Sequence, residues 1–178
     1  MLRRGAVLVA ICESPAGMVF VERAQHLRRH PGQIGFPGGM EELADGGNPV
    51  TTALREFSEE LGVGAERVSV IGRLPDLHQA MNQFLITPVV GILAGDTRFS
   101  IDADEIVGVF KVPLETVVAP GALVPDDQLT KLRGKPMHAL MYEGRRIWGF
   151  TGRILKSFVD AWNAPDSPVR SAIEARLQ

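Results

Sequence analysis

Residues 36–63 read FPGGMEELADGGNPVTTALREFSEELGV, a glycine-rich loop followed by the clearest helix signal in the chain. Asn48 is a preferred N-cap residue, Pro49 suits the first helical position, and Gly62 supplies a stop. Between these limits the apolar residues recur at the spacing of one helix face: Ala53, Leu54, Phe57 and Leu61. The sequence therefore predicts an amphipathic helix over residues 49–61.

The polar face of this helix carries three carboxylates, Glu56, Glu59 and Glu60. Like charges three or four residues apart on a helix repel, and the helix dipole disfavours negative charge in the last turn. Only Arg55 is at hand to offset them. Hard oxygen ligands at this density suit Mg²⁺ or Mn²⁺, with substrate phosphate filling other positions. The competing interpretation is an acidic, solvated surface helix.

The second half of the stretch resembles the Nudix box, the signature of the Nudix hydrolase family. It matches the pattern Arg-Glu-apolar-any-Glu-Glu-any-Gly-apolar at every fixed position from Arg55 onward. The first half departs from the family. Counted from Gly39, the acidic position holds Asp45 in place of glutamate, and nine residues separate it from Arg55 where the family has seven. Glu41 and Glu42 compete with Asp45 for the acidic role.

A second motif lies directly upstream, with three residues between its fixed positions: Arg23-Ala24, Arg28, Gly32 and Phe36-Pro37-Gly38-Gly39. This spacing resembles the motif of the coenzyme A diphosphatase branch of the Nudix family, and residues 87–91 and 147–151 are also similar to that branch. The resemblance implies cleavage of the pyrophosphate of coenzyme A or its derivatives, giving 3′,5′-ADP and 4′-phosphopantetheine or its acyl form. The substrate-binding residues that it implies are Arg23, Arg28 and Gly38.

The same resemblance implies a mechanism in which water attacks the pyrophosphate with Mg²⁺ or Mn²⁺ as cofactor. Arg55 is expected to hold the carboxylates in place by an ion pair. The general base is left open between a box glutamate and a distant acid, for which Glu105 is the candidate; the competing interpretation of Glu105 is an exposed turn acid. The expected catalytic residues are Glu59, Arg55 and Glu105, and the expected metal ligands are Glu56, Glu60, Glu59 and the Gly39 carbonyl.

Length and composition indicate one globular domain over residues 1–178, with 45% hydrophobic and 22% charged residues. A net charge of −2, with one Tyr and two Trp, disfavours a nucleic-acid partner and gives no attraction to anionic membranes, so a small-molecule substrate is the expected partner. The apolar run after Arg4 is interpreted as a strand and not as a signal peptide. Cys12 is expected to be a buried thiol, and a cytoplasmic location follows as the default. The oligomeric state is left open.

Strand and helix patterns alternate along the chain. Strands are predicted at 5–12, 18–23, 68–74, 84–93, 106–112, 138–142 and 145–148, and helices at 49–61, 114–118, 151–162 and 169–177. Pro88 predicts an edge position or a bulge in its strand, and residues 113–136 are expected to be mostly loop. These patterns predict an α/β domain with a mixed sheet. The Nudix resemblance implies an α/β/α sandwich, with a peripheral tail after about residue 163.

Two other functions compete with the coenzyme A assignment. A Nudix hydrolase for another nucleoside diphosphate derivative, such as ADP-ribose, would share the box. A non-catalytic Nudix module that only binds a nucleotide or a protein would be expected to have lost one or more of the three box glutamates, and all three are present. His78 is a tempting base, but its spacing matches no motif, so it is interpreted as a loop histidine.

Overall fold

The computed structural model describes residues 2–27, 30–79 and 83–177. The strands of the main sheet are β1 (Arg3–Glu13), β2 (Ala16–Arg23), β3 (Ile34–Gly35), β4 (Gly38–Met40), β5 (Val68–Arg73), β6 (Leu77–Gln79), β7 (Phe84–Leu93) and β8 (Ile106–Pro113). In the described part of the chain these eight strands follow the order β3-β2-β1-β7-β5, with β4 beside β1, β6 beside β7 and β8 beside β2. β1 and β7 run parallel and the other pairs are antiparallel, so the sheet is mixed, as predicted.

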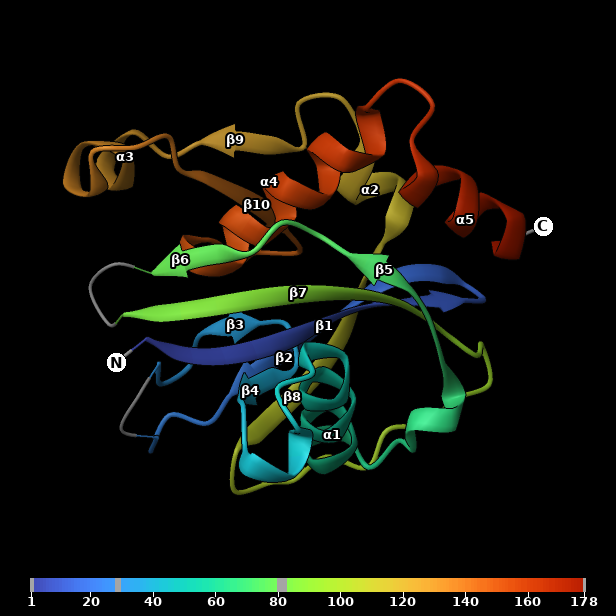
Figure 1. Ribbon diagram of the computed structural model, residues 1–178. Coiled ribbons are helices and arrows are strands. Elements are labelled where there is room, and N and C mark those ends of the chain that lie inside the picture. Colours follow the sequence, from blue (N-terminus) through green and yellow to red (C-terminus); the bar gives the residue numbers. More distant parts are fainter. Residues whose placement is uncertain (1, 28–29, 80–82, 178) are drawn as a thin grey trace.

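Helices cover both faces of this sheet (Figure 1). The helices are α1 (Pro49–Leu61), α2 (Leu114–Val118), α3 (Asp127–Arg133), α4 (Gly149–Asn163) and α5 (Pro168–Leu177), with 3₁₀ turns at Leu43–Asp45 and Ala65–Arg67. α1 packs on one face, while α2, α4 and α5 lie over the other, beside a small sheet of β9 (Leu123–Pro125), β10 (His138–Tyr142) and β11 (Arg145–Ile147). The predicted α/β/α sandwich is confirmed. None of the described helices is both long and apolar enough to cross a membrane.

Alternate residues of β1 divide the interior into two cores, because successive side chains of a strand point to opposite faces. Leu8 belongs to the core under α1, where it packs in the same cluster as Phe57. Val9 belongs to the core under α4, in the same cluster as Phe158. All four side chains are fully buried, and each contributes about 1.5–3 kcal/mol to the free energy of folding by leaving water. The two cores hold α1 and α4 on opposite sides of β1 and β7.

The ends of α1 are those that the sequence predicts. The Asn48 side chain accepts a hydrogen bond from the Val50 N–H at 3.0 Å. Gly62 ends the helix in the left-handed conformation, with φ of 64°, and its N–H bonds the Ser58 carbonyl. Both ends are set by local chemistry, which explains why the sequence alone located them.

The expectation of a mostly irregular segment over residues 113–136 is wrong in part. α2 forms where a short helix was predicted, but β9 and α3 also lie in this segment. α3 begins after Asp126, whose side chain accepts from the Leu129 N–H, and ends at Gly134 in the left-handed conformation. The N-cap and the terminal glycine are local signals that the proline- and charge-rich composition of the segment obscured.

Of the edge position or bulge predicted at Pro88, the edge position is wrong, because β7 lies between β1 on one side and β5 and β6 on the other. The pairing of β5 with β7 does contain a register irregularity, which lies in β5 between Val70 and Gly72. The Pro88 carbonyl accepts the Leu74 N–H at 2.9 Å, just beyond the end of β5. The nitrogen and the carbonyl of one residue point to the same side of an extended strand. The nitrogen of Pro88 therefore faces the gap between the end of β5 and the start of β6. No continuous run of strand hydrogen bonds lies there, so the missing N–H of proline interrupts none.

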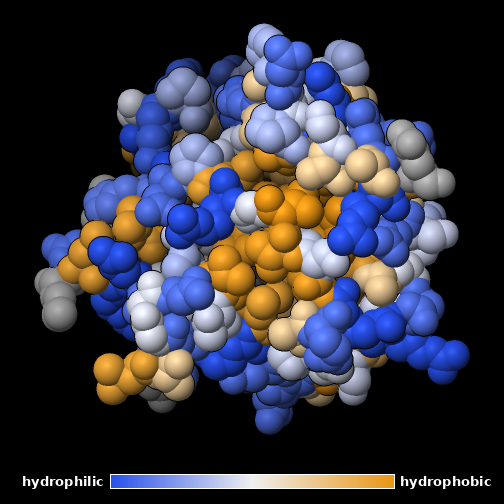
Figure 2. Space-filling view, turned by 45° about the vertical axis from the view of Figure 1, so that its right-hand side comes forward, coloured by the Kyte–Doolittle hydropathy of each residue, from blue (hydrophilic) through white to orange (hydrophobic). Residues whose placement is uncertain are grey.

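β5 ends the sheet on the side that Figure 2 brings forward. Figure 2 shows a hollow on this face that is lined by hydrophobic side chains and surrounded by hydrophilic ones. Val70, in the middle of β5, is 37% exposed.

Candidate active site

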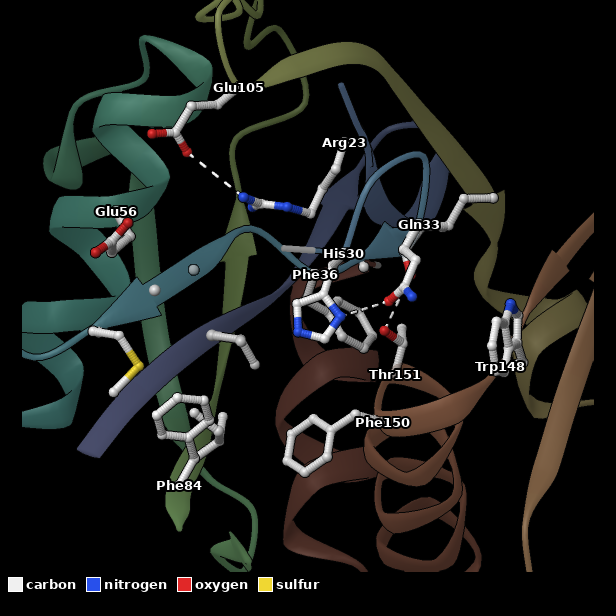
Figure 3. Close-up of a pocket in the computed structure, with 17 residues that line it drawn as sticks. Arg23, His30, Gln33, Phe36, Glu56, Phe84, Glu105, Trp148, Phe150 and Thr151 are labelled. Atoms are coloured by element: carbon white, nitrogen blue, oxygen red, sulfur yellow. Dashed lines mark hydrogen bonds and ion pairs between the residues drawn. The ribbon is translucent and has the colours of Figure 1, made fainter. Parts of the chain in front are cut away.

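A pocket of about 370 Å³ opens between the sheet, α1 and the start of α4 (Figure 3). Its acidic wall contains Glu56 and Glu105, and its aromatic wall contains Phe84, Phe150 and Trp148. The upstream motif and its neighbours supply eight further lining residues: Arg23, His30, Gln33, Ile34, Gly35, Phe36, Gly38 and Gly39. The two sequence motifs therefore meet in one cavity.

The glycine pair before the box brings β4 against α1. The Gly38 N–H donates a hydrogen bond to Glu60 Oε2 at 3.0 Å. A Cβ at Gly38 would overlap the Ala6 carbonyl on β1, and its φ of 152° disfavours other residues. A Cβ at Gly39 would overlap the carboxylate of Glu56. Only glycine allows this strand to pass so close to both the sheet and the acidic face of the helix.

Glu60 is the most deeply buried carboxylate of α1, with 3% of its surface exposed. Burial raises its pKa to about 8, against the lowering effects of the Gly38 N–H and Arg23. Burial also raises the pKa of Glu56, although Arg55 opposes the shift. The negative charge of Glu105 raises the pKa of both. These carboxyls repel one another in a poorly solvated place, so the site favours an added cation.

The donor chemistry of the box glutamates fits a hard divalent cation such as Mg²⁺ or Mn²⁺. Among the described residues, however, no three Asp, Glu, His or Cys side chains already converge on one point. Glu56 and Glu59 are both held by Arg55, and Glu60 is paired with Arg23. A cation bound here would compete with two arginines for these carboxylates.

Arg23 lies at the acidic end of the pocket, where β2 ends. Its Nη1 is 3.5 Å from Glu60 Oε1 and its Nη2 is 4.0 Å from Glu105 Oε2, the contact drawn in Figure 3. Its Nε is buried and has no hydrogen-bond partner among the described residues. A buried donor without a partner is costly, so this guanidinium is suited to a further acceptor such as a phosphate oxygen.

Arg55 is fixed by Asp45, which settles the geometry of the lengthened loop. Asp45 accepts from Arg55 Nε at 3.0 Å and from Nη2 at 3.1 Å, and Arg55 also donates to the Met40 carbonyl at 3.0 Å. Hydrogen bonds from Arg55 lower the pKa of Asp45 to about 2. Aspartate is shorter than the glutamate of the family, and the 3₁₀ turn at Leu43–Asp45 brings its carboxylate within reach of Arg55. Glu41 and Glu42 make no ion pair with Arg55, so Asp45 fills the acidic position.

The other predicted residues differ in how they meet the pocket. The Glu105 side chain is half-exposed and lines the acidic wall. The Glu59 side chain is 60% exposed and bonds Arg55 Nη1 at 2.9 Å, outside the lining set. His78 lies in the short strand β6 and not in a loop as expected, and it does not line the pocket. Arg28 falls outside the described residues.

The sequence did not single out the aromatic wall. Phe84 begins β7, while Trp148 and Phe150 flank the first residue of α4. Residues 147–151 stand out in the sequence only by their resemblance to the coenzyme A branch. Three separate apolar residues carry no signal of a shared pocket, because the pocket exists only when α4 packs over the start of β7.

Comparison with known proteins identifies the family. The profile described as "NUDIX domain" matches residues 1–132. The chain is 36% identical over 154 residues to "Uncharacterized Nudix hydrolase NudL" of Pectobacterium atrosepticum, covering 86% of this chain and 79% of that protein. The NudL of Salmonella newport is 35% identical over 155 residues, covering 86% and 80%. A Nudix hydrolase structure from Alicyclobacillus acidocaldarius has the same fold, with a TM-score of 0.57, 17% identity and coverage of 98% and 96%. The chain therefore belongs to the Nudix hydrolases, pyrophosphohydrolases that act on nucleoside diphosphate derivatives.

Proposed function

We propose that this chain hydrolyses the pyrophosphate bond of coenzyme A or its derivatives, giving 3′,5′-ADP and 4′-phosphopantetheine or its acyl form. One observation carries the proposal. The motif that resembles the coenzyme A branch supplies lining residues, Arg23 among them, to the same pocket as Glu56. This shared pocket supports a contact between the segment that distinguishes the branch and the molecule that is cut.

In this proposal the box glutamates hold Mg²⁺ or Mn²⁺. Glu56 and Glu60 project from one helix face, and Gly39 lies against Glu56, which supports these three as ligands. Glu59 would bind a second ion after leaving Arg55. The cation would supply charge neutralisation at the pyrophosphate and lower the pKa of the attacking water.

Arg23 and Arg28 are the proposed phosphate-binding residues. Arg23 supports this role by its place between Glu60 and Glu105 and by its unpaired Nε. Gly38 would hold Glu60 through its N–H. Arg55 keeps Glu56 and Glu59 oriented and is itself held by Asp45.

Two acids are proposed for the general base. Glu105 borders the pocket and is half-exposed, so it can reach both solvent and substrate. Glu59 is on the box helix but faces Arg55 and solvent. Of the two, Glu105 needs the smaller rearrangement to reach a water in the pocket.

The proposal includes one domain over residues 1–178 and a cytoplasmic location. α5 supports the single domain, because it packs on α4 and β5 and buries Ile173 in the core under α4. Cys12 is buried and its pKa is raised by burial, which makes it an inert thiol suited to a reducing compartment.

Product analysis tests the proposal. The purified protein is incubated with coenzyme A, an acyl-coenzyme A and ADP-ribose, with Mg²⁺ or Mn²⁺, and the products are separated and identified by mass. We expect 3′,5′-ADP from the first two substrates, and ¹⁸O from labelled water in one product. AMP from ADP-ribose at a higher kcat/KM than coenzyme A cleavage would favour the rival substrate class. Nucleotide binding without any hydrolysis would favour a non-catalytic module.

A further inference from the structure

The two ends of the pocket differ in chemistry. Glu56, Glu105 and Arg23 form the end where the pyrophosphate is placed (Figure 3). Away from them, Phe84 and Phe150 form an apolar end (Figure 3). A substrate held at the acidic end by its pyrophosphate must direct one of its two halves toward these rings.

An arginine lies against each ring of the apolar end. The Arg3 guanidinium carbon lies 5.0 Å from the centre of the Phe84 ring, and that of Arg153 lies 5.3 Å from the centre of the Phe150 ring. Arg3 is on the same face of β1 as Val7, a lining residue, because side chains alternate along a strand. Arg153 follows Phe150 by three residues, on the same side of α4. Neither arginine lines the pocket, but each contacts a ring that does.

The sheet brings these two arginines to the same end of the molecule. Arg3 pairs in register with Phe84, and Phe84 pairs with Gln79 on β6. Arg153 Nη1 donates to the carbonyl of His78, the residue before Gln79, at 3.1 Å. β1 and β6 are two strand spacings apart, roughly 10 Å. Two long side chains can span that distance toward one ligand.

A third cation, Lys135, lies close to Arg153. α4 packs against the start of β10 so tightly that a Cβ at Gly152 would overlap the His138 carbonyl. This contact brings the segment before β10, which contains Lys135, beside Arg153. Burial lowers the pKa of Lys135, and the positive charge of Arg153 lowers it further. Burial also lowers the pKa of Arg153.

These cations lack acidic partners. Among the described residues, no carboxylate lies within 4.0 Å of the charged nitrogens of Arg3, Lys135 or Arg153. Lys156, one turn along α4 from Arg153, is by contrast paired with Asp160. Cations that gather without counter-charge beside a pocket favour an anionic ligand.

We propose that Arg153 and Arg3, assisted by Lys135, bind a phosphate monoester of the substrate beyond the Phe84–Phe150 end of the pocket. This inference rests on the proposed function, in which that group is the 3′-phosphate of the adenosine half. The charge of the subsite selects this half, because a pantetheine or acyl chain would leave the cations unpaired. The two aromatic rings then flank the nucleoside between the phosphate monoester and the pyrophosphate.

Coenzyme A and 3′-dephospho-coenzyme A form the test, since they differ only in the group that the subsite would bind. Kinetics are measured for the wild type, Arg153→Gln and Arg3→Gln, with Lys156→Gln as the matched control. We expect the wild type to prefer coenzyme A by about tenfold or more in kcat/KM. Arg153→Gln should lower kcat/KM for coenzyme A about ten- to a hundredfold, and Arg3→Gln should lower it by a smaller factor, because charge-assisted hydrogen bonds are lost. Rates on the dephospho substrate should stay within about twofold, which also shows that each variant is folded. Lys156→Gln should match the wild type on both substrates.

The outcomes separate the two proposals. If the wild type cleaves neither compound, the proposed function fails and this inference with it. If the wild type cleaves coenzyme A and 3′-dephospho-coenzyme A equally well, the subsite alone is wrong. The same follows if Arg153→Gln and Arg3→Gln each lower kcat/KM by the same factor for the two substrates. If Arg28→Gln removes the preference while Arg153→Gln keeps it, the phosphate is bound at the upstream motif instead. If Phe150→Ala slows cleavage of acyl-coenzyme A while coenzyme A is unaffected, an acyl chain occupies the apolar end and the inference is overturned. Calorimetry provides a second readout: 3′,5′-ADP should bind more tightly than AMP, and Arg153→Gln should remove the difference.

Discussion

Asp45→Asn tests whether the lengthened loop supplies the partner of Arg55. The Asp45 carboxylate accepts two hydrogen bonds from Arg55, one from the Thr52 hydroxyl at 2.9 Å and one from the Glu42 N–H at 2.9 Å. Its side chain is 1% exposed. Asparagine keeps one acceptor oxygen, but its NH₂ group must face donors that the second oxygen now satisfies. The variant therefore loses both a charge and an acceptor.

The size of the loss follows from the pKa of Asp45. A fall from 3.8 to about 2 on folding corresponds to about 2.5 kcal/mol in the free energy of unfolding. For a chain of this length that is a fall in Tm of about 5–10 °C. Because the folded pKa lies below the unfolded value, this stabilisation is present above the unfolded pKa and is lost as the pH falls toward 2. The difference between wild type and variant should thus be constant near neutral pH and shrink in acid.

Urea denaturation near pH 7 measures the loss in the free energy of unfolding, and a second measurement near pH 3 shows whether that loss shrinks in acid. Glu41→Gln and Glu42→Gln are the matched controls, because each removes one carboxylate from the same loop. We also expect kcat to fall in Asp45→Asn, since Arg55 then no longer holds Glu56 and Glu59 in place. Wild-type stability in Asp45→Asn, or a larger loss in either control, would refute the assignment.

Three further changes test the acidic wall. Glu60→Gln should nearly abolish turnover, and calorimetry should show that Mn²⁺ binding is nearly lost while the fold is retained. Because burial raises the pKa of Glu60 to about 8, the free energy of unfolding of the metal-free wild type should fall as the pH rises from about 5 to 8. The variant should lack that fall. Gly39→Ala should lower the metal-dependent rate about tenfold or more with little change in Tm, since its Cβ displaces the Glu56 carboxylate. Gly38→Ala should instead lower Tm, because its Cβ meets the backbone of β1. Equal changes in rate and in Tm for the two variants would contradict this division. Arg23→Gln should bind Mn²⁺ at least as tightly as the wild type without substrate, because Arg23 competes for Glu60, and should raise KM; weaker Mn²⁺ binding would count against that competition.

The short elements show where sequence patterns lose their predictive strength. The predicted long strands and both long helices form, although the observed ends differ by a few residues. β3, β4 and β6 are two or three residues long, too short for any periodicity to be visible. Each exists because a neighbouring strand offers its backbone, as β1 does for β4. A two- or three-residue strand depends on long-range partners and leaves no local signal.

The lengthened loop shows a similar division within the site. The box helix and its acids can be located from the sequence, but the sequence leaves the acidic position of the loop open among Asp45, Glu41 and Glu42. Spacing along the chain does not decide which of the three acids fills this position, because a 3₁₀ turn at Leu43–Asp45 shortens the distance that the loop spans. Only the folded loop brings Asp45 Oδ1 within 3.0 Å of Arg55 Nε.

The sequence by itself determined the box helix, its capping residues and its three acids, because helical periodicity and end signals act over one or two turns. It also determined the upstream motif, whose fixed spacing is visible without any structure. The tertiary structure decided that Arg23 meets Glu60, that Phe84 and Phe150 line one pocket, and that an arginine lies against each of the two rings. These contacts join residues that are far apart in the chain, and they form only when the sheet and α4 pack together.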